Sequence, residues 1–229
     1  NINTLMVMRV IGWLLMIEAI FMIIPLGVSL YYREFDCAKS FLSTILITLS
    51  LGMLTSHSIK PLNMDMHRKE GFLLTSLVWV VFSIFGMLPF LFSGVASNIT
   101  DAFYETMAGF TTTGSTIFVD VEKLPKGILL WRSLMQWIGG MGIILFTLAV
   151  IPMLNKSGGV QLFNAEVTGI THDKLRPRVS GTAIGLWGVY LGMTVVMAVF
   201  LMFGPMDWFD SLCHTMSCVS TGGFSTKNE

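Results

Sequence analysis

The sequence predicts an all-α polytopic membrane protein in which spanning helices alternate with short helices that re-enter the membrane. Three observations support this fold class. Hydrophobic residues make up 53% of the chain and charged residues 12%, against about 25% charged residues in an average soluble domain. The apolar residues form runs of the length that a bilayer requires, about 20 residues each. Two shorter segments, each followed by a polar stretch with glycine, interrupt these runs.

Two predicted spans, within residues 1–60, come before the first short segment. The first, Leu5–Leu30, is too long for a signal-peptide core and lacks a small-residue cleavage site. Pro25 is expected to kink it, because proline removes one backbone hydrogen bond. A polar connection, Tyr31–Ser40, leads to the second span, Phe41–Ile59.

Glu18 stands in the middle of the first predicted span. A carboxylate inside a membrane is costly and faces protein or water rather than lipid. It could attract or couple an ion, or it could be a hydrogen-bonded structural carboxylate in a helix bundle. We favour the second interpretation.

Residues 71–154 are predicted to form a unit of span, short helix and span. The third span, Phe72–Phe92, is interrupted by Pro89, and the fourth is Ile128–Leu154. Between them, a short helix is expected over Asp101–Phe110. Thr100 is its predicted N-cap. The negative charge of Asp101 in the first turn interacts favourably with the positive end of the helix dipole.

The C-terminal end of that short helix leads into Thr111, Thr112, Thr113 and Gly114. Non-helical backbone is tolerated at membrane depth only where protein buries it or where it lines a wet cavity. One use of such a strand is to direct its carbonyl oxygens at a cation. The partly negative end of the helix favours a cation at the same place. These four residues are therefore candidate cation-binding residues.

The same pattern returns 109 positions later, from Asp101 to Asp210. Five identities fall within fourteen aligned positions: Asp101, Thr106, Met107, Thr112 and Gly114 match Asp210, Thr215, Met216, Thr221 and Gly223. Residues 180–229 are thus predicted to begin a second unit, with a span at Ser180–Phe203 and a short helix at Met206–Cys218. The candidate cation-binding residues of this unit are Ser220, Thr221, Gly222 and Gly223.

The fourth predicted span carries Arg132, Gln136 and three nearby glycines, Gly139, Gly140 and Gly142. Small residues let membrane helices approach each other closely, and we expect that role for the glycines. Arg132 is expected to reach the membrane surface or to pair with a carboxylate such as Glu105.

Basic residues predict the orientation of the chain. The loops 60–70 and 155–179 together hold seven Lys and Arg residues, and the loops 31–40 and 93–127 hold four. Because basic loops stay in the cytoplasm, the N-terminus and the loop 155–179 are expected inside. Both short helices then re-enter the membrane from outside.

A span, a re-entrant helix, a polar strand with glycine and a second span form the plan of a potassium-channel subunit. With its repeat, the chain resembles the Trk/Ktr/HKT superfamily of potassium transporters, and within it the TrkH membrane subunits. The residues that carry this resemblance are 108–114, 131–133, 136–142, 175–179 and 219–224. The two leading spans also resemble the Trk branch and not the Ktr branch.

The resemblance implies potassium uptake across the bacterial inner membrane by a multi-pass homodimer with one pore per protomer. The eight candidate residues would be two of the four walls of a selectivity filter that binds dehydrated K⁺ through backbone carbonyls. The implied cytoplasmic partners are TrkA-type nucleotide-binding regulatory subunits, and no organic cofactor is expected. The chain would correspond to the N-terminal half of such a protein. Channel-like transport and proton symport both remain open. The alternative is a sodium-coupled Ktr-like or less selective monovalent cation transporter.

Other classes of protein find little support in the sequence. The four histidines are scattered over different predicted elements, so no catalytic or haem-binding constellation is expected, and we predict that the chain is not an enzyme. Cys213 and Cys218 flank His214, but this spacing is a poor match to a metal site. Fourteen basic and fourteen acidic residues cancel, which gives no indication of a nucleic-acid partner. A purely structural protein would have no reason to carry polar strands at membrane depth.

Overall fold

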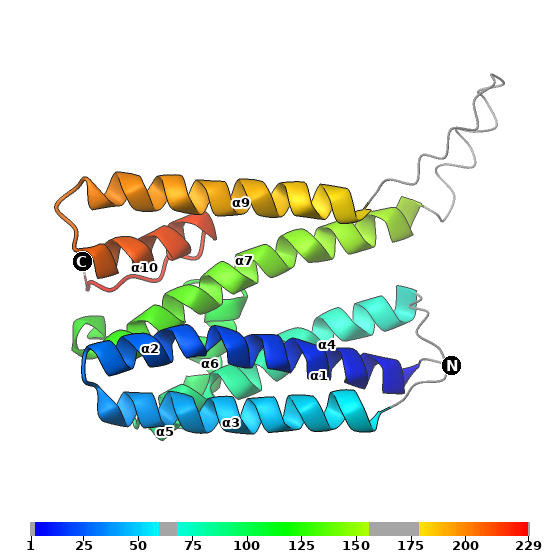
Figure 1. Cartoon of the computed structure of the whole chain (residues 1–229), viewed down its shortest axis with the longest axis horizontal. Coiled ribbons are helices and arrows are strands. Elements are labelled where there is room, and N and C mark those ends of the chain that lie inside the picture. The colour runs from blue at the N-terminus through cyan, green and yellow to red at the C-terminus, as the bar shows by residue number, and fades with distance from the viewer. Residues whose placement is uncertain (1–2, 60–67, 156–178, 229) are drawn as a thin grey trace, which may run out of the picture.

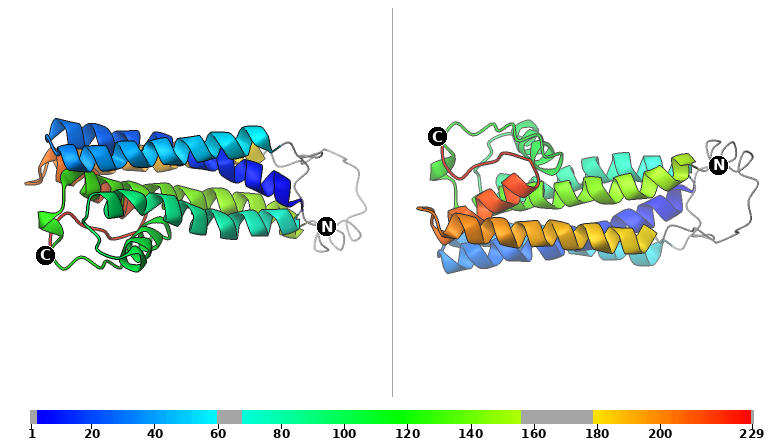
Figure 2. Two further views of the ribbon diagram at one scale, coloured as in Figure 1. Left: turned by 90° about the horizontal axis from the view of Figure 1, so that it is seen from below. Right: turned by 90° about the horizontal axis from the view of Figure 1, so that it is seen from above.

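The computed structural model of the chain describes residues 3–59, 68–155 and 179–228. Every regular element within these ranges is helical, as the sequence predicts. The long helices run side by side along one axis of the molecule (Figure 1), and views from above and below show the bundle to be elongated (Figure 2).

The predicted spans correspond to long helices or to pairs of helices in direct succession. Their bounds are α1 Thr4–Phe21, α2 Ile23–Tyr31, α3 Phe35–Ser58, α4 Arg68–Gly86, α5 Leu88–Phe92, α7 Lys126–Asn155 and α9 Val179–Met202. Four helical stretches in the described part of the chain are long and apolar enough to cross a membrane: Thr4–Tyr31, Phe35–Ser58, Glu70–Phe92 and Gly185–Met202. The basic segments 60–67 and 156–178, on which the predicted orientation depends, lie outside the described residues.

Two helices break next to a proline, as predicted. The break between α1 and α2 falls at Met22, three residues before Pro25, and the break between α4 and α5 falls at Met87, two residues before Pro89. Proline has no backbone N–H, and its ring displaces the carbonyl one turn earlier, so the helix changes direction at that turn.

The predicted polar connection Tyr31–Ser40 is wrong over most of its length, because α3 already begins at Phe35. Asp36 and Lys39 are exposed and lie one turn apart, with 3.4 Å between the Lys39 ammonium and the Asp36 carboxylate. The side chains of Cys37, Ala38 and Ser40 are buried. This first turn of α3 is thus amphipathic. Its mean hydropathy is low, so the sequence predicts a polar connection where a helix has already begun.

The two short helices are α6, Ile99–Phe110, and α10, Trp208–Val219, with 12 residues each. At about 1.5 Å per residue neither can cross a hydrocarbon layer about 30 Å thick. The predicted N-cap Thr100 is wrong, since α6 begins at Ile99, two residues before the predicted start, and Asn98 holds the cap position in extended backbone. The Asn98 amide donates a hydrogen bond of 3.3 Å to Asp101, which does lie in the first turn.

Aromatic side chains form the centre of the core, where α7 meets the first short helix. The Trp131 ring is fully buried and packs edge-on against Phe110 and Phe41. Its indole N–H donates a 3.0 Å hydrogen bond to the carbonyl oxygen of Gly86, at the end of α4. One side chain therefore joins α3, α4, α6 and α7.

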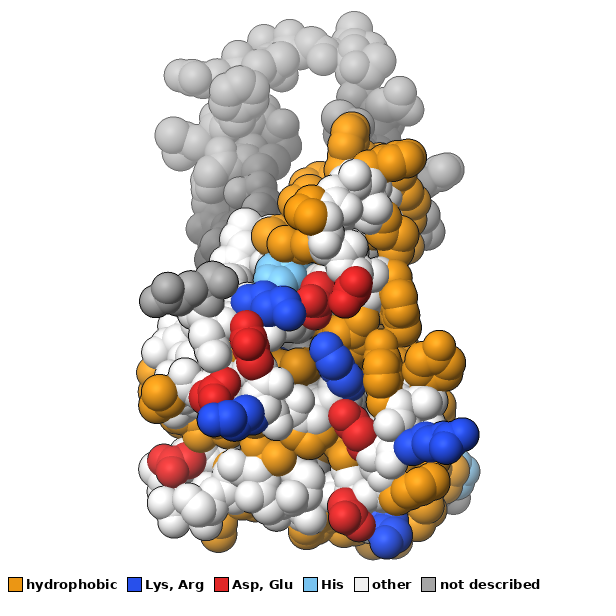
Figure 3. Space-filling model, turned by 90° about the vertical axis from the view of Figure 1, so that its left-hand side faces the viewer, with side chains coloured by type: hydrophobic (Ala, Val, Ile, Leu, Met, Phe, Trp, Pro, Cys, Tyr) orange, Lys and Arg blue, Asp and Glu red, His pale blue; other side chains and the backbone are white. Residues whose placement is uncertain are grey.

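The end of the bundle on the left of Figure 1 carries acidic and basic side chains among hydrophobic ones (Figure 3). The outer sides of the long helices expose large apolar residues such as Ile20, Leu46, Val195 and Phe200. This distribution agrees with helices that cross a bilayer and present a polar end to water.

Glu18 faces protein, as its place in the first span predicts, with 1% of its surface exposed. The prediction that it is hydrogen-bonded is wrong for the described part of the chain, where neither carboxylate oxygen has a partner. A Cβ added at Gly86 would lie 3.1 Å from one Glu18 oxygen and 2.9 Å from both Thr106 and Phe110. The absence of a side chain at Gly86 leaves room beside α4 for the Glu18 carboxyl group and for Thr106 and Phe110 of α6.

The close approach of α1 and α3 depends on glycine. A Cβ added at Gly12 would overlap Thr55 Oγ1 and lie 2.9 Å from the backbone nitrogen of Ser56. A Cβ added at Gly52 would lie 2.9 Å from the carbonyl oxygen of Gly12. The first two spans are thus in backbone contact, as small residues permit in membrane bundles.

We expect Gly12→Leu to lower the stability of the purified protein by about 1–3 kcal/mol, because overpacking forces α1 and α3 apart. Gly27→Leu is the matched control, since nothing lies within 4 Å of a Cβ added at Gly27 in α2. The thermal unfolding midpoint in detergent measures both variants. Equal midpoints would contradict the proposed backbone contact.

Candidate functional site

The first candidate segment begins where α6 ends, and the helix itself satisfies the amide groups of this segment. The Thr112 N–H donates to the carbonyl oxygen of Gly109 at 3.0 Å, and the Thr113 N–H donates to that of Ala108 at 3.0 Å. This pair of bonds is the Schellman motif, which usually places glycine where Thr112 stands.

The second candidate segment repeats this arrangement at the end of α10. The Thr221 N–H donates to the Cys218 carbonyl at 3.0 Å, and the Gly222 N–H donates to the Ser217 carbonyl at 2.8 Å. Each of these positions lies 109 residues after its counterpart. The side chains repeat the pattern as well, with hydroxyl-to-carbonyl bonds of 2.7 Å from Thr111 to Met107 and 2.8 Å from Ser220 to Met216.

The backbone of both segments turns into the left-handed region at matched positions. The φ angles are 54° at Thr112 and 57° at Thr221, and 75° at Gly114 and 85° at Gly223. Our description of these segments as strands is therefore wrong, because their backbone is not extended. Glycine adopts this region freely, but a β-branched threonine does so at a cost of roughly 1–2 kcal/mol. Such strain persists only where the surrounding structure holds it, and it is often found at functional sites.

This conformation leaves backbone oxygens free. The amides at the start of both segments bond back into the short helices, and no donor in the described parts of the chain bonds to the carbonyl oxygens of 111–114 or 220–223. The C-terminal end of each short helix adds a partial negative charge. Free carbonyl oxygens at two such ends are suited to a cation and unsuited to an anion.

The structure brings the two segments together. A Cβ added at Gly114 would overlap the carbonyl oxygen of Gly222, so the two backbones lie side by side at this point. A cavity of about 330 Å³ receives Thr112 from the first segment and Ser220 and Thr221 from the second. Its remaining lining comes from α7, α9 and the end of α10, through Gly140, Leu186, Val189, Tyr190, Met193 and Val219.

The adjacent glycines Gly139 and Gly140 of α7 fit between the ends of the two short helices. A Cβ added at Gly139 would overlap the carbonyl oxygen of Phe110, the last residue of α6. A Cβ added at Gly140 would lie 2.9 Å from the Cβ of Ser220, just beyond α10, and 2.8 Å from the Tyr190 hydroxyl. The predicted packing role is confirmed for both residues, whereas Gly142 has only an ordinary contact with Trp79.

Arg132 forms the ion pair with Glu105 that the sequence suggested. The Arg132 Nε and a Glu105 carboxylate oxygen are 2.7 Å apart, and the two side chains are 1% and 0% exposed. Glu105 also accepts hydrogen bonds from the Thr116 hydroxyl and, at 2.9 Å, from the Ile117 N–H. The carboxylate of α6 therefore fixes the chain that leaves the first segment.

The same guanidinium group also holds the chain that leaves the second segment. Its Nη1 donates to the carbonyl oxygen of Ser225 at 3.1 Å, and its Nη2 donates to the Thr116 hydroxyl at 3.0 Å. The guanidinium carbon lies 4.2 Å from the centre of the Phe224 ring, at cation–π distance. Arg132 thus contacts the continuations of both segments.

His214 holds the chain after the second segment, a structural role that the sequence analysis did not predict. It aligns with Glu105, and it contacts Ser225 just as Glu105 contacts Thr116, 109 positions earlier. One ring nitrogen lies 3.0 Å from the Ser225 hydroxyl and the other 2.8 Å from the carbonyl oxygen of Asp210. The alignment of His214 with Glu105 was the available signal for this role.

A second link joins the two continuations farther along the chain. The Asn228 side chain accepts from the Val121 N–H at 2.8 Å and donates to an Asp120 oxygen at 2.9 Å. The Asn228 hydrogen bond, followed by the Lys123 ammonium, holds the pKa of Asp120 below its ordinary value. The ionised form of Asp120 is the one that this link favours.

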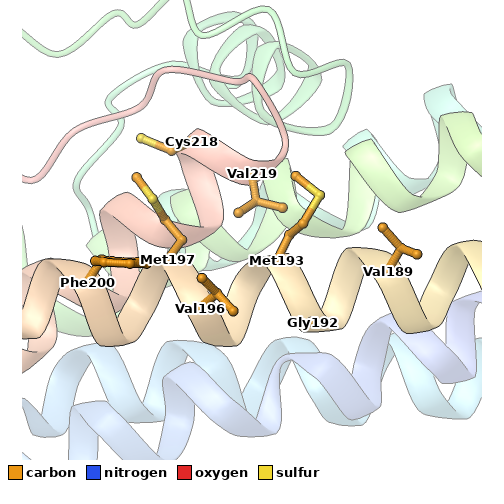
Figure 4. A pocket seen from close by; sticks show the side chains of 8 residues that line it. All are labelled: Val189, Gly192, Met193, Val196, Met197, Phe200, Cys218 and Val219. Carbon is orange, nitrogen blue, oxygen red and sulfur yellow. The ribbon is translucent and has the colours of Figure 1, made fainter.

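An apolar groove of about 520 Å³ runs between α9 and the end of α10 (Figure 4). It is lined by Val189, Gly192, Met193, Val196, Met197, Phe200, Cys218 and Val219. Nothing in this lining carries a charge or a hydroxyl group, so the groove has no chemistry for a cation, in contrast to the neighbouring segments.

Comparison with known proteins identifies a family. A family model described as "TrkH: Cation transport protein" matches residues 37–229. The potassium uptake protein TrkH of Escherichia coli K12 is 40% identical over 222 residues, and the TrkH of Halomonas elongata is 38% identical over 225 residues. These alignments cover 96% and 97% of this chain and 46% of each relative.

A solved structure gives the same result. The crystal structure of the potassium transporter TrkH from Vibrio parahaemolyticus matches with a TM-score of 0.84 at 33% identity. The match covers 99% of this chain and 45% of that one. The chain therefore spans a little less than half the length of the relatives that it matches.

The two buried glutamates give a matched pair of variants. We expect Glu105→Gln to lower the unfolding free energy by about 3–5 kcal/mol, since it leaves the Arg132 charge buried without its partner. Glu18→Gln is expected to cost nothing measurable, because no charge partner of Glu18 lies among the described residues. Thermal unfolding of the purified protein compares the two, and a larger loss from Glu18→Gln would contradict this assignment.

Proposed function

The chain belongs to the TrkH family of cation transport proteins, and from this premise we propose that it forms part of a pathway for potassium uptake. It is a multi-pass protein of the bacterial inner membrane. The observation that carries the proposal is the pairing of two matched segments whose free carbonyl oxygens lie at the ends of two short helices.

In the proposed mechanism the eight residues Thr111 to Gly114 and Ser220 to Gly223 contribute to a selectivity filter. Their backbone carbonyl oxygens replace the water molecules around K⁺ as it enters, while the helix ends lower the energy of the positive charge. Because this chain supplies two such segments, a ring of carbonyls would take its other walls from further segments of the same kind.

The left-handed backbone at Gly114 and Gly223 supports a potassium filter over the alternative. Glycine at both positions allows this conformation without a side chain beside the ion path, and serine at these positions would favour sodium. The two leading spans, α1 with α2 and α3, favour the Trk branch over a sodium-coupled Ktr-like transporter. A less selective monovalent cation transporter is the alternative that the flux measurement below decides.

Two partners complete the proposal. The first is a second copy of the protein, in a homodimer with one pore in each protomer. The second is a set of cytoplasmic TrkA-type regulatory subunits that contact the basic segment 155–179. Family membership supports both, and co-purification of the complete protein with and without the charges of Lys174, Arg176 and Arg178 tests the second.

Ion flux tests the proposed function. The complete gene product carrying this sequence is reconstituted in proteoliposomes, and flux is measured in potassium, rubidium, sodium and lithium. We expect potassium and rubidium to pass well ahead of sodium and lithium. Gly114→Ser is expected to reduce the potassium-to-sodium ratio about tenfold, or ~1.4 kcal/mol of discrimination, because its Cβ would overlap the Gly222 carbonyl.

Gly94→Ser is the matched control. Gly94 has nearly the same φ, +71° against +75° at Gly114, but nothing lies within 4 Å of a Cβ added there. Both variants therefore strain the backbone, and only one disturbs the candidate filter. Flux without preference in the parent protein, or equal selectivity in both variants, would rule out these segments as the filter.

A further inference from the structure

Gln136 lies on α7 one turn after Arg132 and is fully buried. Its side-chain oxygen accepts a 3.0 Å hydrogen bond from the N–H of Phe224, the residue that follows Gly223. The amide group of Gln136 therefore holds the end of the second segment directly, and it does so at a different point from Arg132.

The same amide group lies beside both segments. A Cβ added at Gly222 would overlap the Gln136 amide, and a Cβ added at Gly114 would lie 3.7 Å from its Nε2. Gly114 and Gly222 are also the two residues at which the segments touch each other. One side chain of α7 thus occupies the place behind the contact between the two segments.

Its nitrogen is left without an acceptor. The Gln136 Nε2 is buried and has no hydrogen-bond partner in the described ranges of the chain. An amide nitrogen carries two donors, and leaving a buried donor unsatisfied costs about 1–3 kcal/mol. Such a group in a native structure needs an explanation, and the backbone beside Nε2 belongs to the two candidate filter segments.

We propose that Gln136 is a positioning residue that determines ion selectivity by setting the spacing between the two filter segments. Its oxygen anchors the second segment at Phe224, while its nitrogen lies beside Gly114 and Gly222, where the two segments meet. The inference rests on the proposed function, since it assigns a role within that same filter.

Selectivity is the property that this geometry controls. A carbonyl ring favours K⁺ over the smaller Na⁺ through the number and spacing of its oxygens, so a fixed separation between segments is required. Loss of the anchor at Phe224 lets the second segment move relative to the first. Loss of the donors alone leaves the anchor in place but puts an oxygen where the amide nitrogen lies beside Gly114 and Gly222, and this oxygen repels the carbonyl oxygens there.

Two variants separate the two halves of the amide. Gln136→Met is similar in length and removes both the acceptor and the donors. Gln136→Glu keeps an oxygen for the Phe224 N–H and removes the donors. Trp137→Phe is the matched control on the next residue of α7, because it removes the 3.1 Å hydrogen bond from the indole to the Thr194 hydroxyl of α9 and keeps an aromatic ring beside Phe21 and Tyr190.

The measurements are the potassium-to-sodium flux ratio of the complete gene product in proteoliposomes and the rise in its thermal midpoint when potassium replaces sodium. We expect Gln136→Met to lower the flux ratio about tenfold or more and to reduce the potassium-dependent rise. Gln136→Glu is expected to lower both by a smaller factor, and Trp137→Phe to leave both unchanged.

A merely structural role of Gln136 would lower the thermal midpoint equally in both salts and leave the flux ratio at the parent value, and that result would overturn the inference. Parent-like values for Gln136→Glu would overturn the role of the nitrogen. Should Gln136→Met not fold, the isosteric Gln136→Glu decides alone. Absence of potassium preference in the parent protein would instead defeat the proposed function, so the two failures are distinguishable.

Discussion

Non-helical backbone at membrane depth must be enclosed by protein, and one face of α7 provides that enclosure here. Arg132, Gln136, Gly139 and Gly140 follow the i, i+4, i+7, i+8 spacing of a single helix face. The guanidinium group binds the continuations of both segments, the amide lies behind their contact, and the two glycines admit the ends of the two short helices. The rest of the bundle serves to keep this face in place.

On this face of α7, the long polar side chains and the glycines make different kinds of contact with the two segments. The side chains of Arg132 and Gln136 bind the backbone of Ser225 and Phe224, just after the second segment. At Gly139 and Gly140 the helix ends approach so closely that no Cβ fits. The large and small residues of this face of α7 therefore contact different parts of the two segments.

Sequence reasoning recovered what depends on hydropathy and on local chemistry. It found the spans, the two short helices, the breaks near Pro25 and Pro89, and the Glu105–Arg132 pair. It placed the start of α3 too late, because an amphipathic turn such as the one around Asp36 has low mean hydropathy. It gave Gln136 no role, because the amide acts on backbone that is 88 residues away in sequence.

The backbone of the two segments could not be predicted for a different reason. Threonine disfavours a positive φ, so Thr112 and Thr221 would each be assigned to extended backbone from their side chains alone. The structure overrides this preference through two hydrogen bonds from each segment to the helix before it. Because the override occurs twice at a spacing of 109 residues, it is a property of the unit and not an accident of one loop.

Comparison of the two units shows which features are kept and which differ. The hydrogen bonds that cap the short helices, the φ angles and the hydroxyl bonds to Met107 and Met216 agree. The side chain that binds the chain after each segment differs: it is the carboxylate of Glu105 in the first unit and the imidazole of His214 in the second. Arg132 accounts for this difference between the units. Its one positive charge pairs with Glu105, whereas His214 binds the Ser225 hydroxyl through a ring nitrogen. A second carboxylate at position 214 would place two negative groups near one guanidinium group, with one charge uncompensated. The difference between the side chains of Glu105 and His214 therefore follows from the single arginine that the two units share.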